Sequence, residues 1–387
     1  MNRPSVLSIG MLVLLAATLP LMAQTPDPHN AYAHPAIQIA NVPANPGGPT
    51  GILPAQFKAA YGFNRIPSQG QGQTIALVDA YDDPNVASDL AFYANYFHLT
   101  PCNFQKVIVG NPAQGEGWDL EESLDVEQAC ALVPQANIIL VEANSNSFTD
   151  LLNAVAAASA APYNATVVSI SWGGGEFSGE QAYDSYFCNI VNGNGQPVTF
   201  VAASNEATYP ATSPCVIAAG GTTLVLTTTA PLGNPLQLDY GTESAYGLGG
   251  ISAYEPQPPW QNPACTTFSR NSRCVPDIAS DANPSTGVPV YDTYSEGGWI
   301  EVGGTSLSTP DWVSFFTIVN SLRAGQGKGT LSQAAPDLYA IYYSSDYLTD
   351  FHDITSGSGA GPGYDLATGI GSYQVNNLAP ALVADPN

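Results

Sequence analysis

Short apolar runs alternate with amphipathic or Ala-rich stretches along most of the chain from Thr74 onward. An apolar run followed by a helical stretch indicates a buried strand that leads into a crossover helix. Because such crossovers are right-handed, the pattern predicts an α/β fold with a mostly parallel central sheet and helices on both faces. The expected strands are 75–78, 107–109, 138–141, 167–170, 198–202 and 216–219, and the expected helices lie near 86–97, 119–132, 149–160, 179–191, 306–323 and 333–343.

Three segments depart from this alternation. Residues 24–50 are rich in Pro, Ala, Asn and Gly without an apolar period, which predicts an extended N-terminal arm. Residues 223–300 are rich in Gly, Pro, Tyr and Thr, and we expect a long loop-rich segment that covers or lines a cleft. Residues 344–372 are expected to form a Gly-rich loop. Since no internal repeat is found, residues 51–387 are expected to form one domain.

The first 23 residues have the pattern of a secretory signal peptide. Arg3 precedes an apolar run over residues 6–17, and small residues lead to an expected cleavage after Ala23. The alternative is a membrane anchor, but the run is short and Pro20 follows it. No later stretch is apolar enough to span a bilayer, so we expect a secreted or extracytoplasmic protein without stable membrane association.

Composition narrows the function classes. Eight Lys and Arg stand against 32 Asp and Glu, which gives a net charge of -24 and disfavours nucleic acid or anionic lipid as partners. Most carboxylates therefore lack a cation, and their repulsion falls as the pH drops, as expected of a protein that works in acid. The six cysteines allow three disulfides, of which spacing suggests only one, Cys265 with Cys274.

The strongest chemical signal is the string Gly303-Gly304-Thr305-Ser306 at the start of an apolar helix. Glycines allow close approach of a substrate backbone, and the N–H groups at a helix N-terminus favour developing negative charge. The alternative is an ordinary Thr or Ser N-cap. The longer pattern G-T-S-x-x-x-P, which ends at Pro310, resembles the nucleophile motif of subtilisin-like and sedolisin-like peptidases.

A nucleophilic serine requires a base, and carboxylates are the better candidates here. None of the four histidines lies in a setting suited to that role: His29, His34, His98 and His352. Glu121 and Asp125 are four residues apart, so on a helix they share a face, where a shared proton would separate their pKa values. The alternative is a solvated acidic helix face, which is the expectation for Glu122 and Glu127.

At this point the chain resembles the sedolisin family of serine-carboxyl peptidases over roughly residues 51–380. The Glu-x-x-x-Asp and Gly-Thr-Ser motifs match residue for residue, and the resemblance implies a subtilisin-like fold with a triad of Glu121, Asp125 and Ser306. Further runs match in the same order along the chain: Ser169-Ile170-Ser171-Trp172-Gly173, Pro276-Asp277-Ile278-Ala279 and Asn283-Pro284-x-Thr286-Gly287.

The resemblance also implies supporting residues. Trp172 matches the family tryptophan that helps to position the acidic network, and Asp79 falls where relatives carry an additional acid. The family's oxyanion-hole Asp is replaced by Asn205, whose amide donates a hydrogen bond at any pH. The family commonly has a long N-terminal activation region, whereas here only residues 24–50 are expected before the catalytic part.

The C-terminal loop resembles the family's calcium loop. Carboxylates and main-chain carbonyls on a Gly-rich loop are the hard oxygen ligands that Ca²⁺ requires. The resemblance implies one structural ion held by Asp353, Ile354, Gly361, Gly363 and Asp365. Without the resemblance, two Asp among many glycines read equally well as an ordinary loop.

Together these features predict a secreted, acid-active endopeptidase, a monomer that cleaves protein or peptide substrates through an acyl-enzyme on Ser306. Two alternatives stay open. One is a catalytically inactive secreted binding module that retains the peptidase fold, and the other is an exported esterase that uses the same serine.

Overall fold

A computed structural model describes residues 31–41, 48–228 and 238–386. The predicted signal peptide, residues 1–23, lies outside the described residues. The α-helices are α1 (Pro54–Tyr61), α2 (Val86–Tyr96), α3 (Asp119–Leu132), α4 (Phe148–Ser159), α5 (Thr305–Gly325), α6 (Ala334–Tyr342), α7 (Tyr347–Asp350) and α8 (Val375–Ala384). Short 3₁₀ turns are η2 (Phe63–Arg65), η3 (Glu180–Tyr186), η4 (Pro259–Gln261) and η5 (Ala264–Thr267).

The central sheet has eight strands. Seven of them lie in the order β11-β10-β8-β6-β3-β5-β4, and the eighth, β14, pairs with β10. Every pairing is parallel except that of β10 with β11. The strands of this sheet are β3 (Thr74–Ala80), β4 (Asn103–Val109), β5 (Asn137–Ala143), β6 (Val167–Ile170), β8 (Thr199–Ala203), β10 (Ile217–Thr228), β11 (Leu238–Tyr246) and β14 (Ile278–Asp281).

The remaining strands form small sheets. They are β1 (His34–Pro35), β2 (Ile37–Ile39), β7 (Trp172–Gly175), β9 (Thr208–Tyr209), β12 (Gly250–Pro256), β13 (Ser272–Val275), β15 (Val288–Asp292), β16 (Gly298–Gly304), β17 (Phe351–His352) and β18 (Ser372–Tyr373). The predicted α/β class is confirmed, and each expected strand of the sheet is present.

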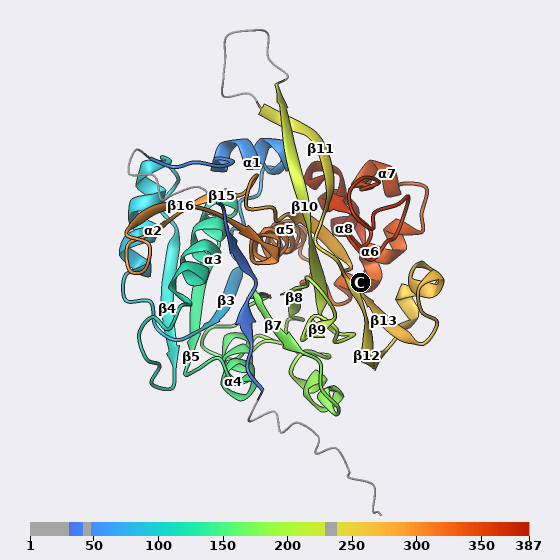
Figure 1. Cartoon of the computed structure of the whole chain (residues 1–387), viewed down its shortest axis with the longest axis horizontal. Coiled ribbons are helices and arrows are strands. Elements are labelled where there is room, and N and C mark those ends of the chain that lie inside the picture. Colours follow the sequence, from blue (N-terminus) through green and yellow to red (C-terminus); the bar gives the residue numbers. More distant parts are fainter. Residues whose placement is uncertain (1–30, 42–47, 229–237, 387) are drawn as a thin grey trace, which may run out of the picture.

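Helices cover both faces of the sheet because its strands are apolar on both sides. Successive side chains of a strand point to opposite faces. In β3, Ile75 and Leu77 join the core cluster that contains α3 and α5, whereas Ala76 and Val78 join the cluster that contains α4. Figure 1 shows α3 and α5 side by side near the centre of the molecule. Within the described residues, no helix has the length and apolarity needed to cross a membrane.

Two local expectations were wrong. Residues 223–300 do not form a loop-rich segment, since their described part contains β11 to β15 and the ends of β10 and β16. Most of these strands are antiparallel and rich in Gly and Tyr, so they do not contain the continuous apolar runs that predicted the other strands. The helix expected near 179–191 is only the 3₁₀ turn η3, which begins after Gly179 with φ 92°.

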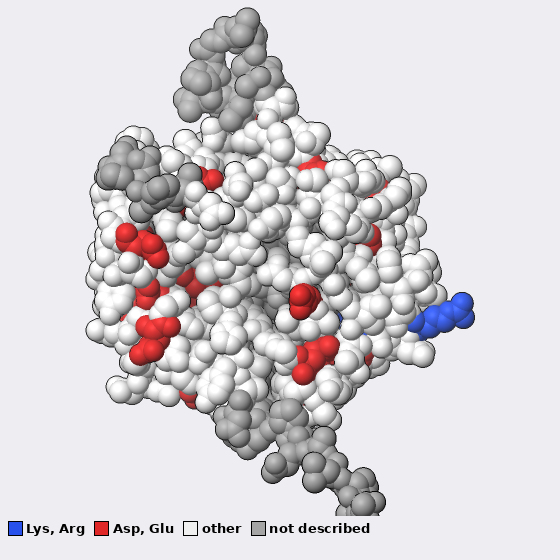
Figure 2. Space-filling model, viewed as in Figure 1, with Lys and Arg blue, Asp and Glu red and all other residues white. Residues whose placement is uncertain are grey.

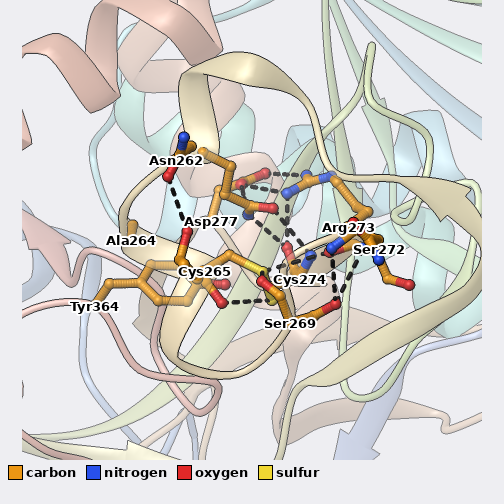
Figure 3. The surroundings of a disulfide bond; sticks show 12 residues. Asn262, Ala264, Cys265, Ser269, Ser272, Arg273, Cys274, Asp277 and Tyr364 are labelled. Carbon is orange, nitrogen blue, oxygen red and sulfur yellow. Dashed lines mark hydrogen bonds and ion pairs between the residues drawn. A yellow bond between two sulfur atoms is a disulfide. The ribbon is translucent and has the colours of Figure 1, made fainter.

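All six cysteines are paired, and the suggested Cys265–Cys274 disulfide is present. The other two disulfides, Cys102–Cys130 and Cys188–Cys215, join residues 28 and 27 positions apart. Figure 3 shows that the Cys265–Cys274 bond lies beside the buried pair of Arg273 and Asp277. Asp277 is bound by several donors there, including Arg273 Nη1 at 2.7 Å.

The described part of the arm is extended, as expected, but it is held against the domain. β1 pairs antiparallel with β7, and β2 pairs antiparallel with β16. Figure 1 shows the arm in blue, crossing the front of the molecule between β16 and β7. Ala33 and Ala40, at the two ends of this stretch, are both buried.

Candidate active site

Helix α3 brings two acids into the interior. Glu121 and Asp125 lie one turn apart on its face toward α5, and neither side chain is exposed. The solvated face expected for Glu122 and Glu127 was wrong, since both are buried as well. The physical reason is that α3 lies between the sheet, α2, α5 and β15, which leaves it no solvent-facing side.

Ser306 meets Glu121 at the start of α5. Gly304 ends β16 with φ 96°, and Thr305 begins the helix, so the chain turns sharply just before the serine. Ser306 Oγ donates to Glu121 Oε2 at 2.8 Å and also lies 3.1 Å from the carbonyl oxygen of Ser171. The structure thus brings together two residues 185 positions apart in the sequence.

Asp125 is held by a residue whose role the sequence reading missed. Ser171 Oγ donates to both carboxylate oxygens of Asp125, at 2.8 and 3.0 Å. The carbonyl of the same residue faces Ser306. Ser171 belongs to the run Ser169–Gly173, in which the sequence predicts a role only for Trp172. The place of Ser171 directly after a buried strand was the available signal.

Asp79 and Trp172 complete the buried cluster. Trp172 Nε1 donates to the carbonyl of Val78 at 2.7 Å, which places its ring against the end of β3, next to Asp79. Asp79 is fully buried, and neither of its oxygens has a hydrogen-bond partner among the described residues. Burial raises the pKa of Asp79 to about 7.

Burial raises the pKa values of all three acids, and the charge of Asp79 raises those of Glu121 and Asp125 further. Burial, followed by the charge of Asp79, raises the pKa of Glu121 well above its usual value, and the hydrogen bond from Ser306 opposes this shift. Burial raises the pKa of Asp125 in the same way, with the charges of Asp79 and Glu121 adding to the effect. Because none of the ion pairs found in the described part of the chain includes these acids, the cluster favours states that retain protons.

No histidine takes part in these contacts within the described residues. His98 ends the turn after α2 with φ 53°, and His352 stacks on Tyr240 with ring centroids 3.7 Å apart. His34 is exposed in β1, and His29 lies outside the described residues. Ser306 is hydrogen-bonded to a carboxyl group instead.

The arm places a peptide bond directly at this serine. The N–H of Ala36 donates to the carbonyl of Ser171 at 3.1 Å, and Ile37 pairs with Gly304. A Cβ atom on Gly304 would lie 2.1 Å from the carbonyl oxygen of Ala36, so only glycine permits this approach. The sequence reading predicted an arm but not that it enters the site.

The N–H of Ile37 points to the carboxyl group of Glu121 and lowers its pKa. This contact is looser than the bond from Ser306, because Glu121 Oε1 has no hydrogen bond of normal geometry among the described residues. The Ala36–Ile37 bond therefore lies close to both Gly304, two residues before Ser306, and the carboxyl group of Glu121.

Asn205 lies in the wall of the cleft that the arm occupies. A cavity of about 490 Å³ is lined by Pro35, Ala36 and Gln38 of the arm together with Asn205 and Tyr246. Gln38 Oε1 accepts a hydrogen bond from the hydroxyl of Tyr246 at 2.5 Å. No hydrogen bond of the Asn205 amide is found within the described residues. Figure 2 shows that acidic side chains lie over this face in small separate groups.

The predicted calcium ligands lie in one loop. Asp353 accepts from the N–H of Gly363 at 3.0 Å, and Asp365 accepts from the N–H of Gly361 at 2.9 Å. Asp353 also accepts a hydrogen bond from the hydroxyl of Tyr347 at 3.2 Å, and burial together with the charges of Asp353 and Asp365 raises the pKa of that hydroxyl. Within the described part of the chain, no group of three or more His, Cys, Asp or Glu side chains could hold a metal. A site here would depend on main-chain carbonyls, as the glycines of the loop allow.

Comparisons with known proteins agree with this geometry. The profile of the subtilase family matches residues 108–326. Kumamolisin from Bacillus sp. (strain MN-32) is 31% identical over an alignment of 372 positions that covers 87% of this chain and 64% of that protein. Sedolisin from Pseudomonas sp. (strain 101) is 28% identical over an alignment of 394 positions that covers 90% of this chain and 64% of that protein.

The fold is similar to that of a solved structure, Pseudomonas sedolisin (serine-carboxyl proteinase) complexed with two molecules of pseudo-iodotyrostatin. The TM-score is 0.72 at 24% identity, covering 88% of this chain and all of that chain. The chain spans somewhat less than two thirds of the length of the two curated relatives named above. Fold, site and sequence matches agree, and the chain belongs to the subtilase family, within its sedolisin branch.

Proposed function

We propose that the protein is an acid-active serine endopeptidase that cleaves peptide bonds through an acyl-enzyme on Ser306. The observation that carries this proposal is the position of the arm. An extended peptide runs through the cleft with the Ala36–Ile37 bond beside Ser306. Main-chain hydrogen bonds hold it, and a substrate peptide of any sequence could make the same bonds. The relatives named as serine-carboxyl peptidases support the same reaction class.

In this mechanism Glu121 is the base and later the acid. Ser306 Oγ attacks the carbonyl carbon while its proton passes to Glu121 Oε2, 2.8 Å away. The same carboxyl then protonates the leaving amine, and the N–H of Ile37, which points to Glu121, marks where that amine would be. Water then attacks the acyl-enzyme with Glu121 again accepting the proton.

Asp125 and Asp79 are proposed to position Glu121 and to set its pKa. Asp125 is oriented by Ser171, and Asp79 adds a carboxyl group without any hydrogen-bonding partner of its own among the described residues. Three buried acids cannot all ionise at once, so the cluster keeps at least one proton while Glu121 is charged. When the pH rises above the pKa of Asp79, near 7, this arrangement is lost and activity should decline.

The oxyanion is proposed to lie between Asn205 and the backbone N–H of Ser306. Asn205 lines the cleft next to Ala36, and Ser306 lies in the first turn of the buried helix α5, whose N-terminus favours negative charge. An amide needs no proton from solvent to act as a donor. This differs from an aspartic acid, which donates only while it is protonated.

We also propose that the C-terminal loop holds one structural Ca²⁺ through Asp353, Ile354, Gly361, Gly363 and Asp365. Asp353 and Asp365 lie in one loop near the hydroxyl of Tyr347, and their carboxylates would supply hard oxygen ligands to such an ion. The ion would neutralise two acids and hold the loop together. Export to an extracytoplasmic compartment is part of the proposal, and the three disulfides support it.

Hydrolysis of casein at acidic pH by wild type and by the Ser306→Ala variant tests the proposal. The endopeptidase should release peptides from casein, and the variant should not. Binding without hydrolysis by the wild type would instead support the inactive module. Hydrolysis of a short-chain ester without any cleavage of casein would support the esterase.

A further inference from the structure

A second concave site lies at the opposite edge of the central sheet. The cavity has a volume of about 960 Å³ and is lined at the amino-terminal ends of β3, β4 and β5. The proposed catalytic residues lie instead at the carboxyl ends of the strands, as Asp79 does in β3. Asn320 of α5 reaches this cavity 14 residues after Ser306, which places it about 21 Å away along the helix.

The lining has an unusual composition for this chain. Of the 20 residues that line it, six are Asn, three are Gln and three are Thr, whereas none is Asp or Glu. The whole chain has 32 acidic residues, so a neutral polar surface of this size is distinctive. Lys328 is the one cation among the lining residues, and its amino group is engaged by the carbonyl of Val383 at 2.6 Å.

The amides are held in a row by the sheet. Asn103, Asn137 and Thr74 occupy matching positions in three neighbouring parallel strands. Asn103 Nδ2 donates to Asn137 Oδ1 at 2.6 Å, and Asn137 Nδ2 donates to Thr74 Oγ1 at 3.3 Å. Each amide has two donor hydrogens and two acceptor positions, so these bonds leave further hydrogen-bonding capacity in a fixed arrangement.

Asn320 provides an independent sign of a ligand. Its side chain is 1% exposed, and its Oδ1 accepts from the N–H of Leu331 at 3.0 Å. Its Nδ2 is buried and has no hydrogen-bond partner among the described residues. An unsatisfied buried donor is destabilising, and an acceptor on a bound ligand would remove that cost.

We propose that this cavity binds a neutral oligosaccharide. Sugar hydroxyls both donate and accept, as the amides and hydroxyls of the lining do, and the ring of Tyr163 offers a surface for the apolar face of a pyranose. The lack of carboxylates disfavours a cationic ligand, the engaged Lys328 disfavours an anionic one, and the polar lining disfavours an apolar one. The volume is at the upper end of the range typical of small-molecule sites.

The test is isothermal titration calorimetry at pH 4 and pH 7, in which the full-length protein is titrated with cellobiose, maltotriose and di-N-acetylchitobiose. At least one sugar should bind, with similar affinity at both pH values because no Asp, Glu or His lines the cavity. Asn103→Leu, at the exposed rim, and Asn320→Leu, in the interior, should each raise Kd about tenfold or more. Asn111→Leu is the matched control on an exposed loop and should leave Kd unchanged.

If Asn320→Leu does not fold, the Kd of the Asn103→Leu variant alone tests the proposal. Absence of binding by all three sugars would overturn the proposal, as would binding that both variants leave unchanged. Binding of N-acetyl-trialanine amide in place of the sugars would also overturn it, since the site would then recognise peptide amides. Casein hydrolysis is not part of this readout, so the result is independent of the proposed peptidase activity.

Discussion

The chain buries carboxylates in two different ways. Asp277, near the Cys265–Cys274 disulfide, is paired with Arg273 and also accepts from the N–H of Ala218 at 2.8 Å and the hydroxyl of Tyr339 at 2.9 Å (Figure 3). Asp79, at the active site, is equally buried but has neither a cation nor a hydrogen bond among the described residues.

The difference separates structural from reactive acids. A buried carboxylate that is surrounded by donors can remain charged and hold neighbouring segments together. A buried carboxyl group without donors binds a proton instead, and burial raises the pKa of Asp79 to about 7 for that reason. The proposed catalytic cluster is of the second kind, and the following predictions test that contrast.

The largest effect is expected from the reacting residues themselves. Ser306→Ala and Glu121→Gln should each lower kcat by about 10³-fold or more, because the nucleophile or its base is lost. The matched controls are His34→Ala and His98→Ala, which should retain activity. Steady-state kinetics on one peptide at pH 4 measures all four. Loss of activity in the folded His98→Ala variant would rule out a carboxyl base.

Breaking the Arg273–Asp277 pair should destabilise the fold. Asp277→Asn leaves the Arg273 charge buried without its partner, and such a loss typically costs about 3–5 kcal/mol. Urea unfolding should show a large decrease in the free energy of unfolding at both pH 4 and pH 7. Glu116→Gln, at an exposed acid, is the control and should have little effect. A small effect of Asp277→Asn would mean that this pair is not a structural ion pair.

Removing the oxyanion donor should cost about a hundredfold in kcat, so Asn205→Ala is expected to be strongly impaired. Asn205→Asp should retain activity only where the new carboxyl is protonated, and its activity should therefore fall at lower pH than that of the wild type. The measurement is kcat/KM against pH for the three proteins on one substrate. Superimposed alkaline limbs, or full activity of Asn205→Ala, would exclude Asn205 as the donor.

Stability should fall as the pH rises from about 4 towards 8. An acid whose pKa is raised in the folded state keeps a proton at pH values where the unfolded chain has lost it. The free energy of unfolding therefore falls as the pH rises from the unfolded pKa to the folded pKa. Burial raises the pKa of Asp83 to about 6 and that of Glu255 to about 8. Melting temperatures should decrease over this range, and Asp79→Asn should reduce the decrease. A Tm that rises towards pH 8 would contradict this account.

The smallest effect is expected from calcium. Chelation at pH 7 should lower Tm by about 3 °C or more, because an ion that binds only the folded state stabilises it. Asp353→Asn should abolish the response, while Asp346→Asn, at an exposed acid of the neighbouring turn, should preserve it. The same Tm in calcium and in chelator, for metal-free wild type, would argue against the site.

The apolar runs predicted the parallel sheet well because strands covered on both faces leave a continuous signal, as Ile75 to Val78 do. The same logic failed for β11 to β13, because these antiparallel strands are partly exposed and lack a continuous apolar run. Glu122 and Glu127 were misplaced because an acidic stretch gives no local sign that other helices will cover it.

At the site, the Glu121–Asp125 spacing and the Gly304–Ser306 string predicted residues that the fold brings together. The contribution of Ser171 and the path of the arm could not be predicted in this way. Both depend on main-chain groups, namely the carbonyl of Ser171 and the N–H groups of Ala36 and Ile37. Every residue type carries these groups, so the sequence does not distinguish them.

The most direct measurement is digestion of a peptide that copies residues 31–40 of the arm, followed by mass spectrometry at pH 4. The account predicts cleavage at one bond, between the residues that correspond to Ala36 and Ile37, by the wild type and not by Ser306→Ala. Mass analysis of the protein itself in the same sample reports whether its own arm is cut at that bond. Cleavage of the peptide at another position, cleavage that survives Ser306→Ala, or no cleavage at all would contradict the account.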